Sequence, residues 1–334
     1  MKNKSIISVE ALQSPWQTLD PFLFSVHHKD NYPNGNEKMQ PVASLEGRNI
    51  GQDFSGKDGW SMYHGQKIPG FPYHPHRGFE TLTITEKGLI DHTDSLNTGG
   101  RFGDGDVQWM TAGNGVQHSE MFPMLNKQGG NAMEFFQVWL NLPAKSKNVP
   151  AEYKMLWHED IPFFNHTDSN GKKTSVKVVV GALNGVKPIS PITNSWASDA
   201  DNEVGIWIIK MEANATWKLP KASKKINRAL YVYKANTIII NDSKLNNYQK
   251  VEVDSLEDLE LIAGDKPVSM LLLQGKPIDE PVAKYGPFVM NTDRELEESF
   301  ALYRKTEFGG WPWPKREYVF PKNKEGLHNM QMGA

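Results

Sequence analysis

The sequence predicts an all-β protein with two strand-rich domains of similar character and one short C-terminal helix. Short runs of β-branched and aromatic residues, such as ETLTIT and VQWMTA, alternate with Gly, Asp and Asn. Runs of this length and spacing are typical of antiparallel barrels and sandwiches. A segment at 142–150 with proline near each end interrupts the pattern. The same kind of strand-forming run returns after it, as in VGIWIIK and RALYVYK.

The domains are expected to follow one another in sequence order. Residues 1–143 form the predicted N-terminal domain, residues 144–153 a linker, and residues 154–334 the C-terminal domain. The C-terminal domain has no histidine between His166 and His328. We therefore expect any histidine-based site to lie in the N-terminal domain alone.

Within the N-terminal domain, residues 16–28 are compact and apolar and are predicted to form the first strand. His27 and His28 are adjacent, so their side chains should point to opposite faces of that strand. Residues 29–60 are polar and rich in glycine and are expected to form a long loop. Loops of this length in compact domains are usually functional or mobile.

The predicted helix spans residues 293–305, near the end of the C-terminal domain. Thr292 and Glu295 have the spacing of a capping box, and Leu296, Phe300 and Tyr303 share one helical face. The following tail, GGWPWPKREYVFPK, contains too many prolines to continue the helix. We expect it to be extended.

Composition excludes several classes of function. The formal net charge of −2 provides no overall basic field, so direct binding of nucleic acid is not expected. There is no cysteine, so a transition metal would have to be held by imidazole and carboxylate groups. The N-terminus lacks the apolar core of a signal peptide, and no run is apolar enough to span a membrane. The expected protein is a cytoplasmic monomer.

Two histidine-containing pairs in the stretch 70–120 indicate a metal site. His74 and His76 are two residues apart, and His118 and Glu120 repeat that spacing. Side chains two apart on a strand lie on the same face. Two such strands facing each other could therefore aim three imidazoles and one carboxylate at a single point.

The chemistry of these groups suits Fe, Mn, Ni, Cu, Zn or Co, and affinity order alone does not select among them. Three His and one Glu would leave two positions open on a six-coordinate ion, which favours catalysis or ligand sensing over a structural role. Hydrogen-bonded strand histidines are the ordinary alternative, but the second pair in a cysteine-free chain favours a metal. Glu80 shares strand parity with His76, and Glu120 with His118, so periodicity does not decide which carboxylate binds the ion.

Longer motifs around these residues resemble a known family. GFPYHPHRGFET resembles the first motif of the cupin superfamily, with Gly70, His74, His76 and Glu80 in order. GDGDVQWMTAGNGVQHSE fits the second cupin motif loosely, with Thr111 at the usual proline. Together with the C-terminal GPFVMNT, these segments resemble the pirin family of bicupins.

This resemblance implies two tandem cupin-type β-barrels with one divalent transition metal, most often Fe(II), in the first barrel. The ligands of the family fall on His74, His76, His118 and Glu120 of this sequence. Glu80 then becomes a residue that could orient a ligand imidazole.

Other charged and aromatic residues within the motifs are pocket candidates. Arg77 and Asp106 are expected to form fold-stabilising ion pairs rather than substrate contacts. Trp109 is expected to pack in the core, or else to line the pocket with Phe79 beside a planar substrate. His92 could reach the pocket mouth.

The resemblance implies two functions. The first is a quercetin 2,3-dioxygenase that cleaves a flavonol-like aromatic substrate with O2, with Glu120 accepting the proton of the flavonol 3-hydroxyl as general base. The second is an iron-dependent, redox-sensing regulatory protein that binds a transcription factor or metabolic enzyme without catalysis. Residues 221–228 provide the short basic cluster that a protein partner could use. The fold alone does not separate the two functions.

Overall fold

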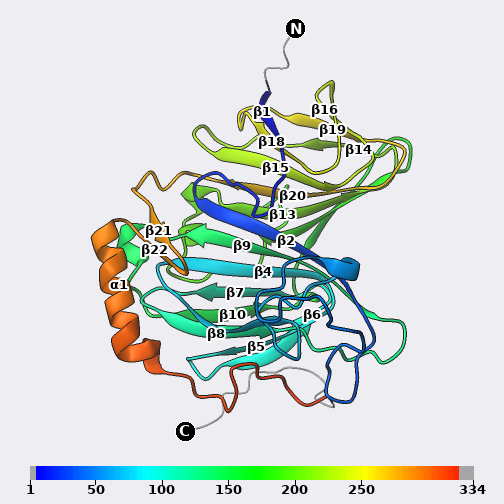
Figure 1. The fold of residues 1–334 in the computed structure, drawn as a ribbon. Coiled ribbons are helices and arrows are strands. Elements are labelled where there is room, and N and C mark those ends of the chain that lie inside the picture. Colours follow the sequence, from blue (N-terminus) through cyan, green and yellow to red (C-terminus); the bar gives the residue numbers. More distant parts are fainter. Residues whose placement is uncertain (1–4, 323–334) are drawn as a thin grey trace. The chain divides into compact units, whose positions relative to one another are not determined.

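A computed structural model describes residues 5–322 and confirms the all-β class, with one α-helix among the described residues (Figure 1). Contacts along the chain divide it into two compact units, each built from two separate segments. Residues 26–158 and 280–322 form a unit that we call the histidine-rich unit, and residues 5–25 and 159–279 form the second unit. Each unit is described by itself.

Two sheets form the barrel of the histidine-rich unit. The first has five strands in the order β10 (Glu152–Leu156), β7 (Val107–Thr111), β4 (Phe79–Lys87), β9 (Asn131–Asn141) and β2 (Phe22–Tyr32). The second has four strands in the order β3 (Gly70–His76), β8 (Val116–Met121), β5 (Leu89–Asp94) and β6 (Gly99–Gly103). Side chains from both sheets, including Phe135 of β9 and Ile90 of β5, meet in one buried cluster. Burial of this apolar surface is what holds the two sheets together.

Short elements complete this unit. They are η1 (Lys57–Gly59), η2 (Ala144–Ser146), the hairpin of β21 (Ala283–Tyr285) and β22 (Phe288–Met290), α1 (Asp293–Thr306) and η5 (Glu307–Gly309).

The second unit is also built from two sheets. Its seven-stranded sheet has the order β1 (Ile6–Ala11), β18 (Gln249–Val253), β15 (Asn227–Lys234), β20 (Val268–Gly275), β13 (Gly205–Met211), β12 (Lys173–Val180) and β11 (Phe163–Thr167). Its four-stranded sheet has the order β14 (Thr216–Leu219), β19 (Leu259–Ala263), β16 (Ile238–Ile240) and β17 (Ser243–Leu245). The unit also contains η3 (Trp196–Ser198) and η4 (Ala200–Asn202). Val, Ile and Leu side chains of both sheets fill the core between them.

The division into units differs from the sequential domains expected from the sequence. The strand β1 precedes the histidine motifs, yet it pairs with β18 of the second unit. Residues 280–322, expected in the C-terminal domain, contact the histidine-rich unit instead. The expected linker contains η2 and lies within that unit. Pairing between distant strands, which periodicity does not report, causes the difference.

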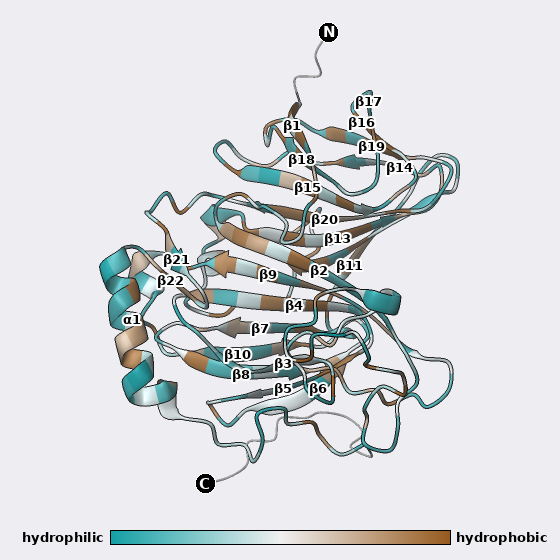
Figure 2. Cartoon of the chain, viewed as in Figure 1, coloured by the Kyte–Doolittle hydropathy of each residue, from teal (hydrophilic) through white to brown (hydrophobic). Residues whose placement is uncertain are grey.

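The predicted helix is present as α1, with its start and its buried face as expected. The Thr292 hydroxyl accepts a hydrogen bond from the Glu295 backbone N–H, and the Glu295 side chain accepts one from the Thr292 backbone N–H. Both groups therefore satisfy N–H donors that a helix start leaves free. Leu296 and Phe300 pack on Phe288 of β22. Most of the remaining residues of the helix are hydrophilic (Figure 2).

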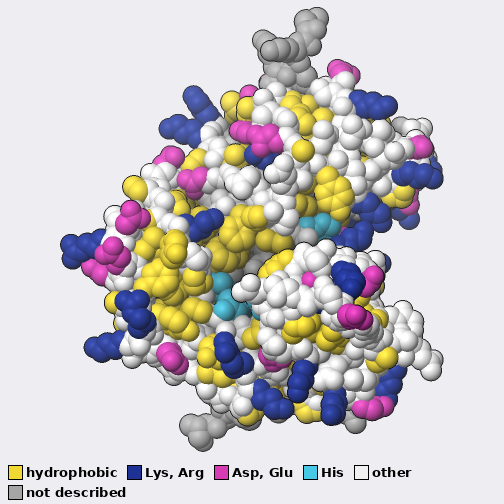
Figure 3. All heavy atoms as spheres, viewed as in Figure 1, with side chains coloured by type: hydrophobic (Ala, Val, Ile, Leu, Met, Phe, Trp, Pro, Cys, Tyr) yellow, Lys and Arg dark blue, Asp and Glu magenta, His cyan; other side chains and the backbone are white. Residues whose placement is uncertain are grey.

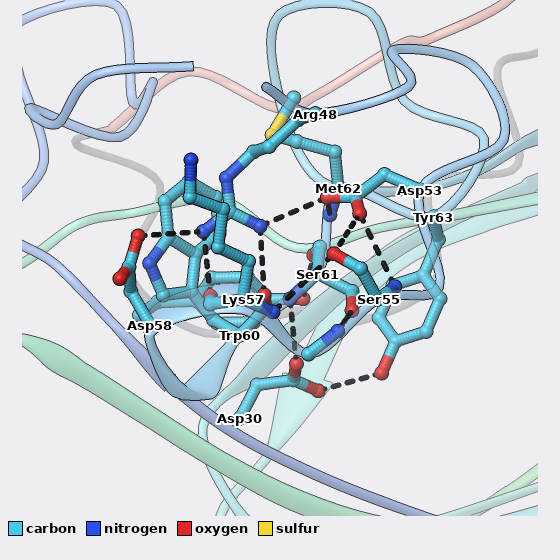
Figure 4. A network of polar contacts seen from close by, with 12 residues as sticks. Asp30, Arg48, Asp53, Ser55, Lys57, Asp58, Trp60, Ser61, Met62 and Tyr63 are labelled. Carbon is cyan, nitrogen blue, oxygen red and sulfur yellow. Dashed lines mark hydrogen bonds and ion pairs between the residues drawn. The ribbon is translucent and has the colours of Figure 1, made fainter. Parts of the chain in front are cut away.

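The segment between β2 and β3 is irregular, as expected, but a buried polar network fixes it (Figure 4). The Arg48 guanidinium donates to the Asp53 carboxylate at 2.9 Å and to the Trp60 carbonyl oxygen at 2.8 Å. The Asp30 carboxylate accepts from the Ser61 backbone N–H at 2.9 Å and from the Tyr63 hydroxyl at 2.8 Å. The network ties the segment to β2, so this long loop is an ordered part of the barrel.

None of the helices described between residues 5 and 322 is long and apolar enough to cross a membrane.

Candidate metal centre

The two histidine-containing pairs lie on neighbouring strands of the same sheet. β3 and β8 are antiparallel partners, with His74 directly opposite His118 and Phe71 opposite Glu120. Directly opposed residues present their side chains on the same face of a sheet. The sequence had suggested two strands facing each other, whereas hydrogen-bonded neighbours bring the side chains together here. The register shifts between Phe71 and His74, which marks an irregularity just before the first histidine.

Gly70 permits this close pairing at the start of β3. Its φ is +135°, and a Cβ there would clash with the carbonyl oxygen of Glu120. Only glycine avoids both the strain and the clash. The motif glycine therefore sets the position of β3 against β8.

The three imidazoles form one compact cluster. Nε2 of His118 lies 3.0 Å from Nε2 of His74, and one nitrogen from each of His74, His76 and His118 lies within 4.8 Å of the others. Nδ1 of His74 lies 2.9 Å from the carbonyl oxygen of Pro72, to which it can donate. That bond would leave the lone pair of Nε2 directed at the other two rings.

Burial keeps these imidazoles neutral. It lowers the pKa of His74 to about 4, and it lowers the pKa values of His76 and His118 well below the ordinary value. Neighbouring histidines add to the effect at all three, because each disfavours a positive charge on the next. Neutral imidazole is the form that binds a metal ion.

A buried nitrogen atom without a partner indicates what the cluster fits. Nε2 of His76 is buried and has no hydrogen-bond partner among the described residues. Leaving such an atom unsatisfied is costly unless something else binds it. A separation of about 3 Å between nitrogens also suits two ligands of one ion, since metal–nitrogen bonds are about 2.1 Å. The donor set therefore fits a divalent transition metal.

Glu120 lies at the edge of the cluster. Its Oε2 is 4.0 Å from Nε2 of His118 and accepts a hydrogen bond from the Gln137 amide at 2.8 Å. Its Oε1 accepts from the Thr83 hydroxyl at 2.9 Å. Burial raises the pKa of Glu120, while the positive potential of His92 and these two hydrogen bonds oppose the rise. Glu120 is thus a buried carboxyl group held in a fixed orientation beside the histidines.

A cavity of about 680 Å³ opens onto the cluster and lies wholly within the histidine-rich unit. Its walls include three aromatic rings, those of Phe71, Tyr73 and Trp139. Histidine side chains are visible at the surface beside a hydrophobic area (Figure 3). The remaining lining residues are Gly51, His64, Gln66, Pro72, His74, His76, Glu120, Gln137, Gly286, Pro287, Arg316 and Glu317. The volume is that of a small-molecule site.

Among the other carboxyl and charged candidates, none lines this cavity. Glu80 is buried and accepts a hydrogen bond from the Thr111 hydroxyl at 2.6 Å. Arg77 donates to the Asn148 side chain at 2.8 Å. Asp106 accepts a hydrogen bond from the backbone N–H of His158 at 2.9 Å. The structure therefore places these groups in the framework around the site.

The aromatic candidates lie behind the cavity wall. The Phe79 ring stacks on Trp139 with 4.0 Å between centroids and meets the His76 ring edge-on. Trp109 is fully buried on β7. The ring of His92 lies 5.6 Å from that of His118, and its Nε2 lies 3.0 Å from the Asp94 carboxylate. Phe79 and His92 thus support residues of the cluster from behind.

Sequence reasoning missed two groups of lining residues. Gln137 and Trp139 lie two residues apart on β9, so their side chains share one face of the strand. This spacing could have identified them from the sequence. Arg316 and Glu317 come from the C-terminal tail and reach the cavity by long-range folding. No local pattern in the sequence reports that placement.

A two-sheet barrel with a cluster of imidazoles that could hold a metal ion is the architecture of a cupin, here joined to a second β-unit. The family model described as Pirin matches residues 7–140, and the one described as Pirin C-terminal cupin domain matches residues 206–309. The chain therefore belongs to the pirin family, and the resemblance seen in its motifs is confirmed.

Relatives carry two kinds of name. The chain is 32% identical over 245 residues to "Putative quercetin 2,3-dioxygenase PA2418" of Pseudomonas aeruginosa, covering 73% of this chain and 80% of the relative. It is 33% identical over 248 residues to a pirin-like protein of Caulobacter vibrioides, covering 72% and 81%. A crystal structure of quercetin 2,3-dioxygenase from Acinetobacter baumannii matches with a TM-score of 0.72 at 25% identity, covering 92% of this chain and 98% of that one.

Proposed function

We propose that this chain is a metal-dependent oxygenase of the quercetin 2,3-dioxygenase type, which cleaves a flavonol-like substrate with O2. The observation that carries the proposal is that one cavity contains two of the clustered histidines, the buried Glu120 and an aromatic wall. A purely regulatory protein has no need of a cavity of substrate size next to its metal. The names of the relatives support the same activity.

His74, His76 and His118 would hold the ion, with Glu120 as the fourth ligand or as a nearby base. When bound, a divalent ion such as Fe(II) would lower the pKa of a coordinated hydroxyl and provide the site for O2 chemistry. The absence of thiolates and the neutral state of the imidazoles suit such an ion.

The aromatic wall would orient a planar substrate. Trp139 is held by stacking on Phe79, and Phe71 and Tyr73 also line the cavity. Flat ring faces of this kind bind a fused aromatic system through area burial and offset stacking. The substrate would enter with its 3-hydroxyl group toward the histidines.

Glu120 would accept the proton of that hydroxyl. Thr83 and Gln137 keep its carboxylate oxygens in place beside the histidines, which positions Glu120 to receive the proton. In the overall reaction two carbon–carbon bonds of the central ring break, both atoms of O2 enter the organic product, and one ring carbon leaves as carbon monoxide. The apolar wall would exclude water from the reacting ring.

The experiment is anaerobic reconstitution with Fe(II), followed by aerobic incubation with quercetin. We expect loss of the visible absorbance of quercetin together with release of carbon monoxide. Glu120→Gln should slow both by about 100-fold or more, while Glu257→Gln, an exposed change in the second unit, should alter neither. Bound iron without turnover would refute the oxygenase and would favour the regulatory alternative.

A further inference from the structure

A second cavity of about 650 Å³ adjoins the mouth of the first. Both cavities include Gln66, Arg316 and Glu317 in their walls, so they meet at the C-terminal tail. The second one is lined additionally by Lys38, Gln40, Lys67, Ile68, Lys315, Tyr318 and Val319. We call it the basic groove. All of its residues belong to the histidine-rich unit.

The groove has an excess of positive charge. Lys38, Lys67, Lys315 and Arg316 line it together with a single carboxylate, that of Glu317. Among residues 5–322, none of the four cations forms an ion pair, and Glu317 instead accepts a hydrogen bond from the Gln66 backbone N–H at 3.0 Å. Lys and Arg side chains gather where the tail runs after α1 (Figures 1 and 3). Arg316 and Lys67 act electrostatically on Glu317, but four cations against one carboxylate leave the groove with a net positive charge that an anion from solution would neutralise.

The tail is held firmly at both ends of the groove. The Trp313 indole N–H donates to the Asp94 carbonyl oxygen at 2.8 Å. Phe320 donates its backbone N–H to the Asp91 carboxylate at 2.8 Å, and its carbonyl oxygen accepts from Arg101 at 2.9 Å. Arg101 is itself paired with Asp91 at 2.6 Å. A segment anchored in this way presents its cations from a fixed backbone.

Arg316 lies at the junction of the two cavities. Its carbonyl oxygen accepts a hydrogen bond from the Tyr73 backbone N–H at 3.1 Å, and its guanidinium carbon is 4.7 Å from the centroid of the Tyr73 ring. Trp311 stacks on the same ring at 5.0 Å. A guanidinium placed over an aromatic face keeps its N–H edge available to a carboxylate or sulfate group. Arg316 can therefore contact a ligand that extends from one cavity into the other.

We infer that the basic groove is a subsite for an oxyanion substituent of the aromatic substrate, and this inference rests on the proposed function. The planar ring system would occupy the cavity beside the histidines, with its 3-hydroxyl inward. A carboxylate or sulfate ester on the far side of the ring system would reach Arg316, Lys315 and Lys67. The substrates favoured by this site are thus acidic conjugates of a flavonol-like compound rather than the bare flavonol.

The test measures binding without O2, so that it does not depend on turnover. Isothermal titration calorimetry under anaerobic conditions would compare quercetin 7-glucoside with quercetin 7-glucuronide, which differ mainly in one carboxylate. Quercetin 7-sulfate is the second anionic probe and separates sulfate from carboxylate recognition. We expect both anionic ligands to bind about tenfold more tightly than the glucoside at low salt, with the advantage falling as salt rises.

Variants identify the residues responsible. Arg316→Gln, and the double change Lys67→Ala with Lys315→Ala, should reduce the anionic preference to within about twofold, and Arg316→Lys should restore part of it. Lys244→Ala, an exposed lysine of the second unit, should leave the preference unchanged. Equal affinity for glucoside and glucuronide in the wild-type protein would overturn the inference.

The outcomes also separate this inference from the proposed function. Turnover of quercetin without tighter binding of the anionic conjugates would support the oxygenase and refute the anion subsite. Tighter binding of the anionic conjugates without any turnover would support the anion subsite and refute the oxygenase. The inference would also be overturned if neither anionic conjugate bound more tightly than the glucoside while the basic groove bound an acidic protein.

Discussion

Nε2 of His118 lies 3.0 Å from Nε2 of His74, although the two residues are 44 positions apart in the chain. Pairing of β3 with β8 sets this distance, because it places the two residues directly opposite each other. The His118 ring is buried and the His74 ring is half-buried, and the pKa of each is held below its ordinary value, so two neutral rings meet at this point. The spacing of this pair therefore fits two ligands of one metal ion.

Replacing His118 by Ala is expected to lower the bound metal from about one ion per chain to near zero, because three imidazoles then become two. His166→Ala, in the second unit, should retain the metal. Elemental analysis by mass spectrometry after reconstitution measures both. Full metal retention in the His118 variant would refute the proposed ligand set.

Glu120→Gln is expected to lower kcat by about 100-fold or more, since it removes the proposed proton acceptor. Glu80→Gln should cost less metal and less activity, because Glu80 hydrogen-bonds to Thr111 and does not line the cavity. Metal content and steady-state rates of the two variants should be compared side by side. The reverse order would assign the carboxylate role to Glu80.

Trp139→Leu is expected to weaken quercetin binding by about tenfold through the loss of the ring face that Phe79 supports. Trp139→Phe keeps an aromatic face and should lose much less. Quenching of protein fluorescence by anaerobic titration measures the dissociation constants, with the wild type as reference. Equal binding by all three proteins would place the substrate elsewhere.

Arg48→Ala is expected to lower the free energy of unfolding by about 3–5 kcal/mol, because it leaves the buried Asp53 carboxylate without its partner. Arg294→Ala removes an exposed pair with Glu298 on α1 and should cost less than about 1 kcal/mol. Urea unfolding of the two variants gives the comparison. Similar losses would show that the network in the β2–β3 segment contributes little.

Asp30 provides a pH test of the same network. Burial raises the pKa of Asp30 to about 6 in the folded protein, from an ordinary value of 3.8. Between these values the folded protein holds a proton that the unfolded chain has released, so the contribution of Asp30 to stability falls as pH rises. Asp30→Asn cannot titrate. The stability of the wild type relative to this variant should therefore decrease by up to about 3 kcal/mol from pH 4 to pH 7.

Urea unfolding of both proteins across this range measures the difference, which cancels the opposite contribution of His28. Burial lowers the pKa of His28 to about 3, so His28 alone would make the protein more stable as pH rises. A difference that stays constant with pH would show that Asp30 is already charged in the folded protein at pH 4.

Local pattern predicted the local structure well and the long-range structure poorly. The capping box at Thr292 and the strand runs around His74 and His118 depend on neighbours in sequence, and the structure has an element at each place. The strand predicted at 16–28 lies instead at Phe22–Tyr32, and β1 was not anticipated. The glycine-containing run at 99–103 forms the strand β6, because neighbouring β5 supplies its hydrogen bonds.

The candidate site shows the same division. Spacing singled out the three histidines and left Glu80 and Glu120 as alternative carboxylates, since period-two pairs report only which side chains share a face. Spacing alone did not show that β3 and β8 are direct partners. The placement of Arg316 in the cavity wall depends on contacts between residues more than 200 positions apart, such as that of Arg101 with Phe320. Such contacts follow from the packing of the whole unit and leave no trace in a short window.

The discontinuous make-up of the histidine-rich unit has a consequence during protein synthesis. The ribosome completes residues 26–158 first, then builds residues 159–279 of the other unit, and only afterwards adds the residues that carry Pro287, Arg316 and Glu317. At ordinary elongation rates this delay is on the order of ten seconds. A barrel that folded during this interval would have one wall of its cavity missing. Ions in the surrounding fluid would then reach the imidazoles from that side until the final segment was made and folded against them.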